Sequence, residues 1–179
     1  MSKAVFLDRD GTLLDEPPNE VVDSWGKFKI KEGICYLSQL SSIGFCFFIV
    51  TNQEAIGEGK LEENFYKKTN KKLLERLREE NVFVEKIYTC PHAAVEKCSC
   101  AKPQTEFARR ASKEFNLSLE QSWMIGDRIE DINFAQNSGM KSILLKSRFH
   151  NKTENFRDTI LAEDLHKAID TILYLFSNP

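Results

Sequence analysis

The chain has 179 residues and a mass of 20.6 kDa, which suffices for one domain with a substantial core but not for two well-filled domains. Its 25 Lys+Arg and 27 Asp+Glu residues leave a formal net charge of -2, and this balance excludes the strongly basic surface of a nucleic-acid or anionic-membrane binder. Hydrophobic residues make up 41% of the chain, which is typical of a globular protein. We expect a single domain over residues 1–179.

The N-terminus and the cysteines predict the compartment. Charged residues interrupt the first apolar run before it reaches signal-peptide length, and no run approaches the ~18–20 apolar residues of a membrane span. The five cysteines are an odd number, which argues against a secreted disulfide framework. These features predict a cytoplasmic protein. They do not predict its oligomeric state.

Short apolar runs alternate with longer helical patterns along the chain, which is the signature of βαβ units. We therefore predict an α/β, doubly wound, Rossmann-like three-layer sandwich with a mostly parallel sheet. The predicted strands are Ala4–Asp8, Phe45–Asn52, Lys86–Cys90, Trp123–Asp127 and Lys141–Leu145. The predicted helices are Gly33–Ile43, Leu61–Glu80, Thr105–Phe115, Glu130–Asn137 and Ala162–Phe176. The longest irregular segment near the start is Asp15–Trp25.

Polar side chains close several predicted strands, where burial does not explain them. Asp8 and Asp127 end two strands, Thr51 and Asn52 end a third, and Cys90 ends a fourth. In doubly wound sheets ligands bind beyond the carboxyl ends of the strands. We therefore expect the functional site at this edge of the sheet.

The first strand ends in Asp8-Arg9-Asp10-Gly11-Thr12. Two acids separated by one residue and followed by a glycine that permits a tight turn can direct carboxylates at one metal or substrate atom. A turn with a capping aspartate is the other interpretation of these residues taken alone.

The flanking string FLDRDGTLL resembles motif I of the haloacid dehalogenase (HAD) superfamily. The later motifs of the superfamily have counterparts in the expected order: Thr51-Asn52-Gln53, Lys102-Pro103 and the acids of Gly126-Asp127-Arg128-Ile129-Glu130-Asp131. The resemblance implies a HAD-like phosphatase fold, and the chain length leaves no room for a large cap domain. It covers the chain from Ala4 to about Leu145.

The resemblance also implies the chemistry at these positions. Asp8 is the expected nucleophile, which attacks phosphorus to form a covalent acyl-phosphate. Asp10 is the expected general acid and base. Mg²⁺ is the expected catalytic cofactor, held by Asp8, Asp127 and the backbone carbonyl of Asp10.

Further positions are expected to hold the phosphoryl group. Lys102 would place a positive charge on it, and Thr51 and a backbone N–H near Asn52 would donate hydrogen bonds to its oxygens. Asp131 is expected to orient Lys102 or a metal-bound water. An exposed acid at the start of a helix is its other interpretation.

A second group of possible metal ligands lies between residues 90 and 100. Three cysteines and one histidine are a common complement for a structural, four-coordinate Zn²⁺ site. A redox pair or a chance group of free thiols is the alternative. Closing this loop around zinc would fix Lys102, which is only two residues away. The four predicted ligands are Cys90, His92, Cys98 and Cys100, while Cys35 and Cys46 are expected in the core and His150 and His166 at the surface.

This zinc loop narrows the resemblance to a subgroup without a large cap that includes histidinol-phosphate phosphatases and D-glycero-D-manno-heptose 1,7-bisphosphate phosphatases. Glu16-Pro17-Pro18 resembles a loop of the histidinol-phosphate phosphatases, and the five-residue gap between His92 and Cys98 has the same length. The Glu16 carboxylate could pair with a substrate ammonium. The alternative interpretation is a solvent-exposed glutamate in a loop. Ala101 stands where these relatives carry an arginine, a loss that Arg128 could replace.

The expected substrate is therefore a small phosphorylated metabolite, with L-histidinol phosphate as the first choice and D-glycero-D-manno-heptose 1,7-bisphosphate as the alternative. A polynucleotide 3′-phosphatase is a more distant possibility, because the basic surface that nucleic acid requires is missing. A non-catalytic phosphate-binding relative is the non-enzyme alternative. It predicts a disrupted nucleophile or metal-binding acid, whereas Asp8, Asp10 and Asp127 are all present.

Overall fold

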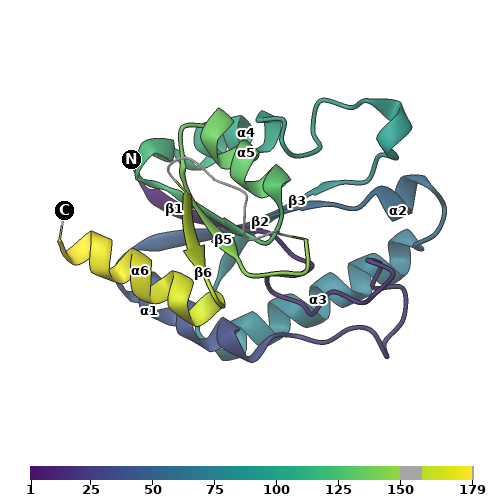
Figure 1. The fold of residues 1–179 in the computed structure, drawn as a ribbon, viewed down its shortest axis with the longest axis horizontal. Coiled ribbons are helices and arrows are strands. Elements are labelled where there is room, and N and C mark those ends of the chain that lie inside the picture. Colours follow the sequence, from purple (N-terminus) through teal and green to yellow (C-terminus); the bar gives the residue numbers. More distant parts are fainter. Residues whose placement is uncertain (150–158, 179) are drawn as a thin grey trace.

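A computed structural model describes residues 1–149 and 159–178 (Figure 1). Its described strands form one six-stranded sheet in the order β3-β2-β1-β4-β5-β6, and every neighbouring pair is parallel. The strands are β1 Lys3–Leu7, β2 Phe45–Asn52, β3 Val84–Cys90, β4 Trp123–Gly126, β5 Lys141–Leu145 and β6 Thr159–Ala162. The doubly wound α/β prediction is confirmed.

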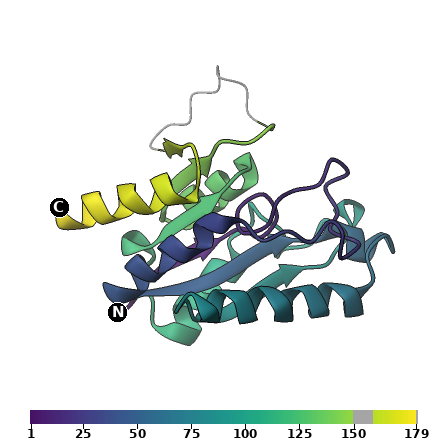
Figure 2. The same ribbon diagram turned by 90° about the horizontal axis from the view of Figure 1, so that it is seen from below.

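Helices cover both faces of the sheet, as Figures 1 and 2 show. One face packs against α1 Leu37–Ser42, α3 Glu63–Glu79 and α6 Leu165–Ser177, and the other against α4 Glu106–Phe115 and α5 Ile129–Asn137. The short helix α2 Glu54–Gly57 follows β2. Three 3₁₀ helices span Glu32–Tyr36, Ala94–Glu96 and Leu119–Gln121.

Two hydrophobic cores explain why the central strands read as continuous apolar runs. On β1, Val5 and Leu7 join the core under α1, α3 and α6, whereas Ala4 and Phe6 join the core under α4 and α5. A strand buried on both faces has no polar positions to alternate. The first polar residue after such a strand therefore lies at the edge of the sheet, where ligands bind.

The predicted elements differ from the structure in several places. Helix α2 was not predicted, and β3 begins at Val84 rather than Lys86. The stretch predicted as helix Gly33–Ile43 is divided into a 3₁₀ helix and α1. The last helix begins at Leu165 rather than Ala162, because Ala162 belongs to the unpredicted strand β6 and Asp164 caps the helix through a 2.8 Å bond from the Lys167 N–H. Strand β6 is an edge strand of four residues with Leu161 67% exposed, which makes its apolar signal short and weak.

The described residues contain no second sheet of the kind that a large cap would add. None of their helices is long and apolar enough to cross a membrane. Cys35 and Cys46 are partly buried, and Cys46 packs against the core under α4 and α5. His166 stacks on Tyr36 with ring centroids 3.8 Å apart, and His150 lies outside the described residues.

Candidate active site

The polar residues that close the central strands lie together at one edge of the sheet. Leu7 of β1 pairs with Ile49 of β2 and Ile125 of β4, so the residues that follow these positions emerge side by side. The Asp8 backbone N–H donates to the Ile125 carbonyl at 3.0 Å. The parallel register thus places Asp8 between the ends of β2 and β4, as the sequence predicts.

Lys102 joins three elements through its buried ammonium. Its Nζ donates to Asp8 Oδ1 at 2.5 Å, to Asp131 Oδ1 at 2.5 Å and to the Val50 carbonyl at 2.8 Å. Burial alone would lower the pKa of Lys102, but the two carboxylates raise it above its usual value. Asp131 is 1% exposed and in contact with Lys102, so it is not an exposed acid at a helix start.

The Asn52 side chain holds the backbone of Lys102 on both sides. Asn52 Oδ1 accepts from the Lys102 N–H at 2.9 Å, and Asn52 Nδ2 donates to the Lys102 carbonyl at 3.1 Å. These contacts involve only the Asn52 side chain, so its backbone N–H is left for the expected contact with a phosphoryl group. Thr51 is 1% exposed and accepts from Gln53 Nε2 at 2.9 Å.

Three buried carboxylates form a compact acidic group at this edge. Oxygen atoms of Asp8, Asp127 and Asp131 lie within 4.8 Å of one another. Burial, opposed by Lys102 and reinforced by the other two acids, raises the pKa of Asp8 well above its ordinary value. Burial and the charge of Asp131 raise the pKa of Asp127 to about 7. Such a group is electrostatically unfavourable without an additional cation.

The surroundings of Asp127 fit an oxygen-seeking divalent cation. Its Oδ1 is buried and has no hydrogen-bond partner among the described residues. Gly11, at φ +85°, lets the backbone approach so closely that a Cβ there would lie 2.3 Å from Asp127 Oδ2. Buried carboxylate oxygens without donors are the ligands that Mg²⁺ prefers. The donor set therefore fits the magnesium expected from the sequence, with Asp8 and Asp127 as side-chain ligands.

Asp10 lies beside the acidic group and is held by two neighbours. Arg9 Nη1 donates to both Asp10 oxygens at 2.9 Å, and Gln53 Nε2 donates to Asp10 Oδ2 at 2.6 Å. The Asp10 side chain remains 15% exposed and lines the same cavity as Asp8. A carboxyl group in this place can exchange a proton with a molecule bound against Asp8.

The cavity over Asp8 has a volume of about 910 Å³ and is strongly acidic. Nine carboxylate side chains line it but only three cationic ones. Around its mouth, Glu54 and Glu130 have no ion-pair partner among the described residues, whereas Glu20 pairs with Arg128 at 2.8 Å. The acids are Asp8, Asp10, Glu16, Glu20, Asp23, Glu54, Glu58, Glu130 and Asp131, and the cations are Lys60, Lys102 and Arg128.

Glu16 and Arg128, both expected to contact substrate, are paired with each other. Arg128 Nη2 donates to Glu16 Oε1 at 2.5 Å, and Arg148 Nη2 lies 3.8 Å from Glu16 Oε2. Arg148 also donates to the Pro17 carbonyl at 2.9 Å. These contacts fasten the Glu16-Pro17-Pro18 loop to the ends of β4 and β5. The loop adjoins a second cavity of about 550 Å³ with five cationic side chains: Lys27, Lys29, Lys31, Lys146 and Arg148.

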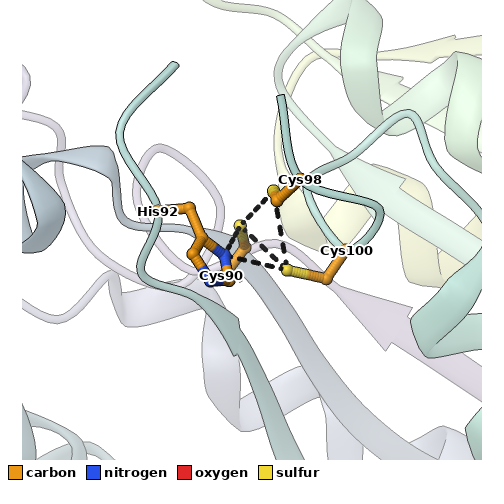
Figure 3. A group of neighbouring side chains, drawn as sticks. All are labelled: Cys90, His92, Cys98 and Cys100. Carbon is orange, nitrogen blue, oxygen red and sulfur yellow. Dashed lines mark hydrogen bonds between the residues drawn. The ribbon is translucent and has the colours of Figure 1, made fainter. Parts of the chain in front are cut away.

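The cysteine and histidine side chains after β3 converge on one point, as Figure 3 shows. Cys100 Sγ lies 3.2 Å from Cys90 Sγ, 3.6 Å from Cys98 Sγ and 3.2 Å from His92 Nδ1. The sulfur–sulfur separations are about 0.2–0.6 Å shorter than the edge of a tetrahedron around zinc, which is about 3.8 Å at a Zn–S bond of about 2.3 Å. The four predicted ligands thus form a possible metal site compatible with zinc.

The Cys98 thiol is already prone to ionise within this group. Its desolvation is outweighed by hydrogen bonds from backbone N–H groups and neighbouring thiols, which lower the pKa of Cys98 to about 7. Burial raises the pKa of Cys90. Zinc binds cysteines as thiolates, so a thiol that ionises readily favours the binding of a metal ion by this group.

Two residues that contact the site were not singled out in the sequence. Arg9 and Gln53 hold Asp10. The sequence did offer a signal for Arg9, which lies between two acids directly after a strand that was predicted to be buried. Glu54 and Glu130 at the cavity mouth were also missed, because exposed glutamates at helix starts are common and only the fold shows that both face one cavity.

Comparisons with known proteins agree with this architecture. The HAD-hydrolase-like family profile matches residues 99–168. The chain is 37% identical over 141 residues to the histidine biosynthesis bifunctional protein HisB of Legionella pneumophila (strain Lens), covering 78% of this chain and 40% of that protein. It is 34% identical over 143 residues to HisB of Campylobacter jejuni, covering 79% of this chain and 41% of that protein. The chain therefore spans about two fifths of the length of these relatives.

Solved structures share the fold over nearly the whole chain. D,D-heptose 1,7-bisphosphate phosphatase from B. bronchiseptica, complexed with magnesium and phosphate, superposes with a TM-score of 0.88 at 22% identity, covering 97% of this chain and 99% of that one. A putative HAD-like phosphatase from Mesorhizobium loti gives a TM-score of 0.78 at 24% identity, covering 96% and 87%. In its motifs at the ends of β1, β2 and β4, its sheet order and its match to the family profile over residues 99–168, the chain resembles the haloacid dehalogenase (HAD)-like hydrolases.

Proposed function

We propose that this protein is a Mg²⁺-dependent phosphatase that hydrolyses a small phosphomonoester through an aspartyl-phosphate on Asp8, within one domain. One observation carries the proposal. The Asp8 carboxylate is neutralised by Lys102 at 2.5 Å and faces a cavity that Asp10 also lines. A nucleophile, its counter-charge and a proton-exchanging acid therefore meet at one cavity.

The residues divide the reaction into two balanced steps. In the first, an Asp8 oxygen forms a bond to phosphorus while the bond from phosphorus to the ester oxygen breaks, and Asp10 gives its proton to the leaving alkoxide. In the second, Asp10 takes a proton from water while the water oxygen forms a bond to phosphorus and the bond from phosphorus to the Asp8 oxygen breaks. Inorganic phosphate leaves and Asp8 returns to a carboxylate. The first step thus avoids release of an unprotonated alkoxide, and the second avoids attack by water that no base assists.

The Asp8 carboxylate and the phosphate of the substrate are both anions, so positive charge beside Asp8 is required to bring them together. Lys102 remains in place through Asp131 and the Val50 carbonyl, so its charge is available to the phosphoryl oxygens once Asp8 is phosphorylated. Thr51 and the backbone near Asn52 would donate hydrogen bonds to the same oxygens. Mg²⁺ held by Asp8, Asp127 and the Asp10 carbonyl would supply further charge neutralisation.

Zinc is proposed as the structural ion of the Cys90, His92, Cys98 and Cys100 group. Four protein ligands leave no open coordination position, which is typical of a structural site. The last ligand is two residues from Lys102, whose backbone is held from the other side by Asn52. Metal binding would thus fix the lysine that serves the phosphoryl group.

The acidic cavity favours a substrate whose leaving group carries a positive charge. An ammonium or imidazolium is attracted by Glu54 and Glu130, which lack partners among the described residues, while a second phosphate is repelled by the carboxylate majority. L-Histidinol phosphate has such a cationic leaving group. The relatives named histidine biosynthesis bifunctional protein support the same substrate. Because Glu16 is already paired with Arg128, we assign the attraction of the ammonium to Glu54 and Glu130.

D-glycero-D-manno-heptose 1,7-bisphosphate is the second candidate, favoured by the lysine-rich cavity beside the Glu16 loop and by the heptose-phosphatase neighbour. A second phosphate would have to extend into that cavity past the Glu16–Arg128 pair. Substrates with long polyanionic chains, such as polynucleotides, would meet the carboxylates around the mouth of the catalytic cavity.

A substrate panel tests the proposal. Measured with Mg²⁺ at neutral pH, kcat/KM for L-histidinol phosphate should exceed that for the heptose bisphosphate by more than about tenfold, and a preference of that size for the bisphosphate would reverse the assignment. Glu54→Gln and Glu130→Gln should raise KM for the cationic substrate but not for an uncharged alkyl phosphate. Lys67→Gln, on the exposed side of α3, is a surface control. A protein that hydrolyses no phosphomonoester would refute the activity itself.

A further inference from the structure

Hydrogen-bond donors from two residues hold the Asp10 carboxylate in one orientation. Arg9 Nη1 bridges both of its oxygens at 2.9 Å, and Gln53 Nε2 reaches Oδ2 at 2.6 Å. Oδ2 therefore accepts two hydrogen bonds and Oδ1 one. This asymmetry leaves Oδ1 as the oxygen with more free lone-pair capacity.

Arg9 is itself fixed by helix α3. It is 1% exposed, its Nη2 donates to Thr69 Oγ1 at 2.8 Å, and its guanidinium lies 4.9 Å from the centre of the Tyr66 ring. Thr69 in turn donates to the Tyr66 carbonyl at 2.8 Å. Tyr66 is connected to β3 by a 2.7 Å hydrogen bond between its hydroxyl and Thr89. Arg9, and through it Asp10, is thus held by α3 and β3.

Gln53 is fixed from the other side. Its Nε2 also donates to Thr51 Oγ1 at 2.9 Å, and its backbone N–H donates to the Cys90 carbonyl at 2.7 Å. Burying a guanidinium is costly unless a carboxylate compensates it. The only carboxylate within ion-pair distance of Arg9 among the described residues is Asp10. Arg9 does not line the cavity, so it acts through Asp10 and not on a bound phosphoryl group.

We propose that Arg9 and Gln53 are positioning residues that fix the Asp10 carboxyl so that Oδ1 is the atom that exchanges the proton with the leaving oxygen. This inference rests on the proposed phosphatase activity. The planar guanidinium and the amide restrict rotation of the carboxyl group, which keeps Oδ1, the oxygen with fewer donors, free to carry the proton. Thr69 extends the same control to α3 by fixing Arg9.

The test uses leaving groups that differ in their need for a proton. Phosphoryl transfer from an alkyl phosphate requires protonation of the alkoxide, whereas p-nitrophenolate leaves without it. kcat/KM reports events up to the first irreversible step, so it isolates this transfer from the later attack of water. The measurements use the full chain with Mg²⁺, the best alkyl phosphate of the substrate panel and p-nitrophenyl phosphate.

In Arg9→Lys, Gln53→Met and Thr69→Val, kcat/KM for the alkyl phosphate should fall by up to about 10²-fold, the scale of general acid catalysis. For p-nitrophenyl phosphate it should stay within about threefold of wild type, since orientation of the acid no longer matters there. Asp10→Asn should show the same selectivity with a larger loss. Ser122→Ala is the matched control, because it removes buried hydrogen bonds at the opposite end of the sheet.

Equal losses toward both substrates would overturn the inference, since a merely structural defect does not distinguish leaving groups. Should Arg9→Lys fail to fold, the ratio measured in Gln53→Met and Thr69→Val decides. A wild-type protein that hydrolyses neither substrate would instead refute the proposed activity, so the two failures are distinguishable.

Discussion

Replacing Gly11 with alanine places a methyl group against the acid that is proposed to hold the metal. The added Cβ would lie 2.3 Å from Asp127 Oδ2 and 2.4 Å from its Cγ. Ordinary van der Waals contact begins at 3.4 Å, so one group must move by about 1 Å, a displacement that can cost about 10²-fold in rate. Because Gly11 is tied by a backbone hydrogen bond to Leu14 at 2.9 Å, we expect the Asp127 carboxylate to be displaced.

Gly44→Ala separates this displacement from backbone strain. Gly44 also has φ +85°, but an added Cβ would meet nothing within 4 Å. Alanine in this left-handed conformation costs about 1–2 kcal/mol, so both variants should lose this amount in unfolding free energy. Only Gly11→Ala should in addition lose activity and bind Mg²⁺ more weakly.

The assay is a Mg²⁺ titration of kcat for each variant, together with denaturant unfolding of the metal-free protein. Gly11→Ala should need a higher Mg²⁺ concentration for half-maximal activity and should reach a kcat about 10²-fold below wild type. Gly44→Ala should match wild type in both quantities. Normal Mg²⁺ dependence in Gly11→Ala, or an equal loss in Gly44→Ala, would refute the assignment of Asp127 as a metal ligand.

Three further predictions concern the metal sites and the buried acids. Purified protein should contain about one zinc per chain. Cys98→Ser should lower Tm by several degrees and kcat by roughly tenfold, because the backbone of Lys102 loses the support of the zinc loop. A zinc-free preparation with full activity and unchanged Tm would contradict this. Asp131→Asn should reduce kcat/KM by about 10²-fold while the fold, followed by circular dichroism, is retained, since Lys102 keeps only Asp8 as its acidic partner; wild-type kinetics would count against the orienting role. In metal-free protein the unfolding free energy should fall as pH rises from about 4 to about 7, because folded Asp127, with its pKa raised to about 7, holds a proton that the unfolded chain has released. Saturating Mg²⁺ should remove that decline, and denaturant midpoints measured at each pH with and without the ion would show whether it does.

The sequence predicted the central fold because its signals there agree. Strands β1, β2, β4 and β5 are continuous apolar runs that end at polar residues, and parallel pairing brings those ends together. The edge strand β6 gave no comparable signal, since its exposed Leu161 and its four-residue length resemble the start of the following helix. The residues of β6 become a strand through their pairing with β5, which the sequence does not display.

The candidate site was predictable where chemistry is concentrated in a motif. Asp8, Asp10, Asp127 and Lys102 meet as expected at one edge of the sheet. The contacts that depend on distant segments were not predictable, because Arg9 reaches Thr69 on α3 across 60 positions of sequence. Likewise, the opposite charges of Glu16 and Arg128 gave no sign that they would pair with each other.

The carboxylate majority of the catalytic cavity is likewise a property of the fold. Acids at its mouth come from the Glu16 loop, α2 and α5, three segments that the sequence separates widely. In the sequence each resembles an ordinary glutamate of a loop or a helix start. Together they set the charge that the leaving group of the substrate must match, and this is why the composition of the whole chain, with a net charge of -2, gave no indication of it.

The most direct test of the central claim is detection of the phosphoryl group on Asp8 during turnover. Protein quenched in acid while hydrolysing its best substrate should yield an Asp8-containing peptide that carries one phosphoryl group by mass spectrometry, and borohydride reduction of that acyl-phosphate should convert Asp8 to homoserine. Asp8→Asn should give neither product and should lose at least about 10³-fold in kcat while remaining folded. Turnover without modification of Asp8, or persistent activity in Asp8→Asn, would contradict the account.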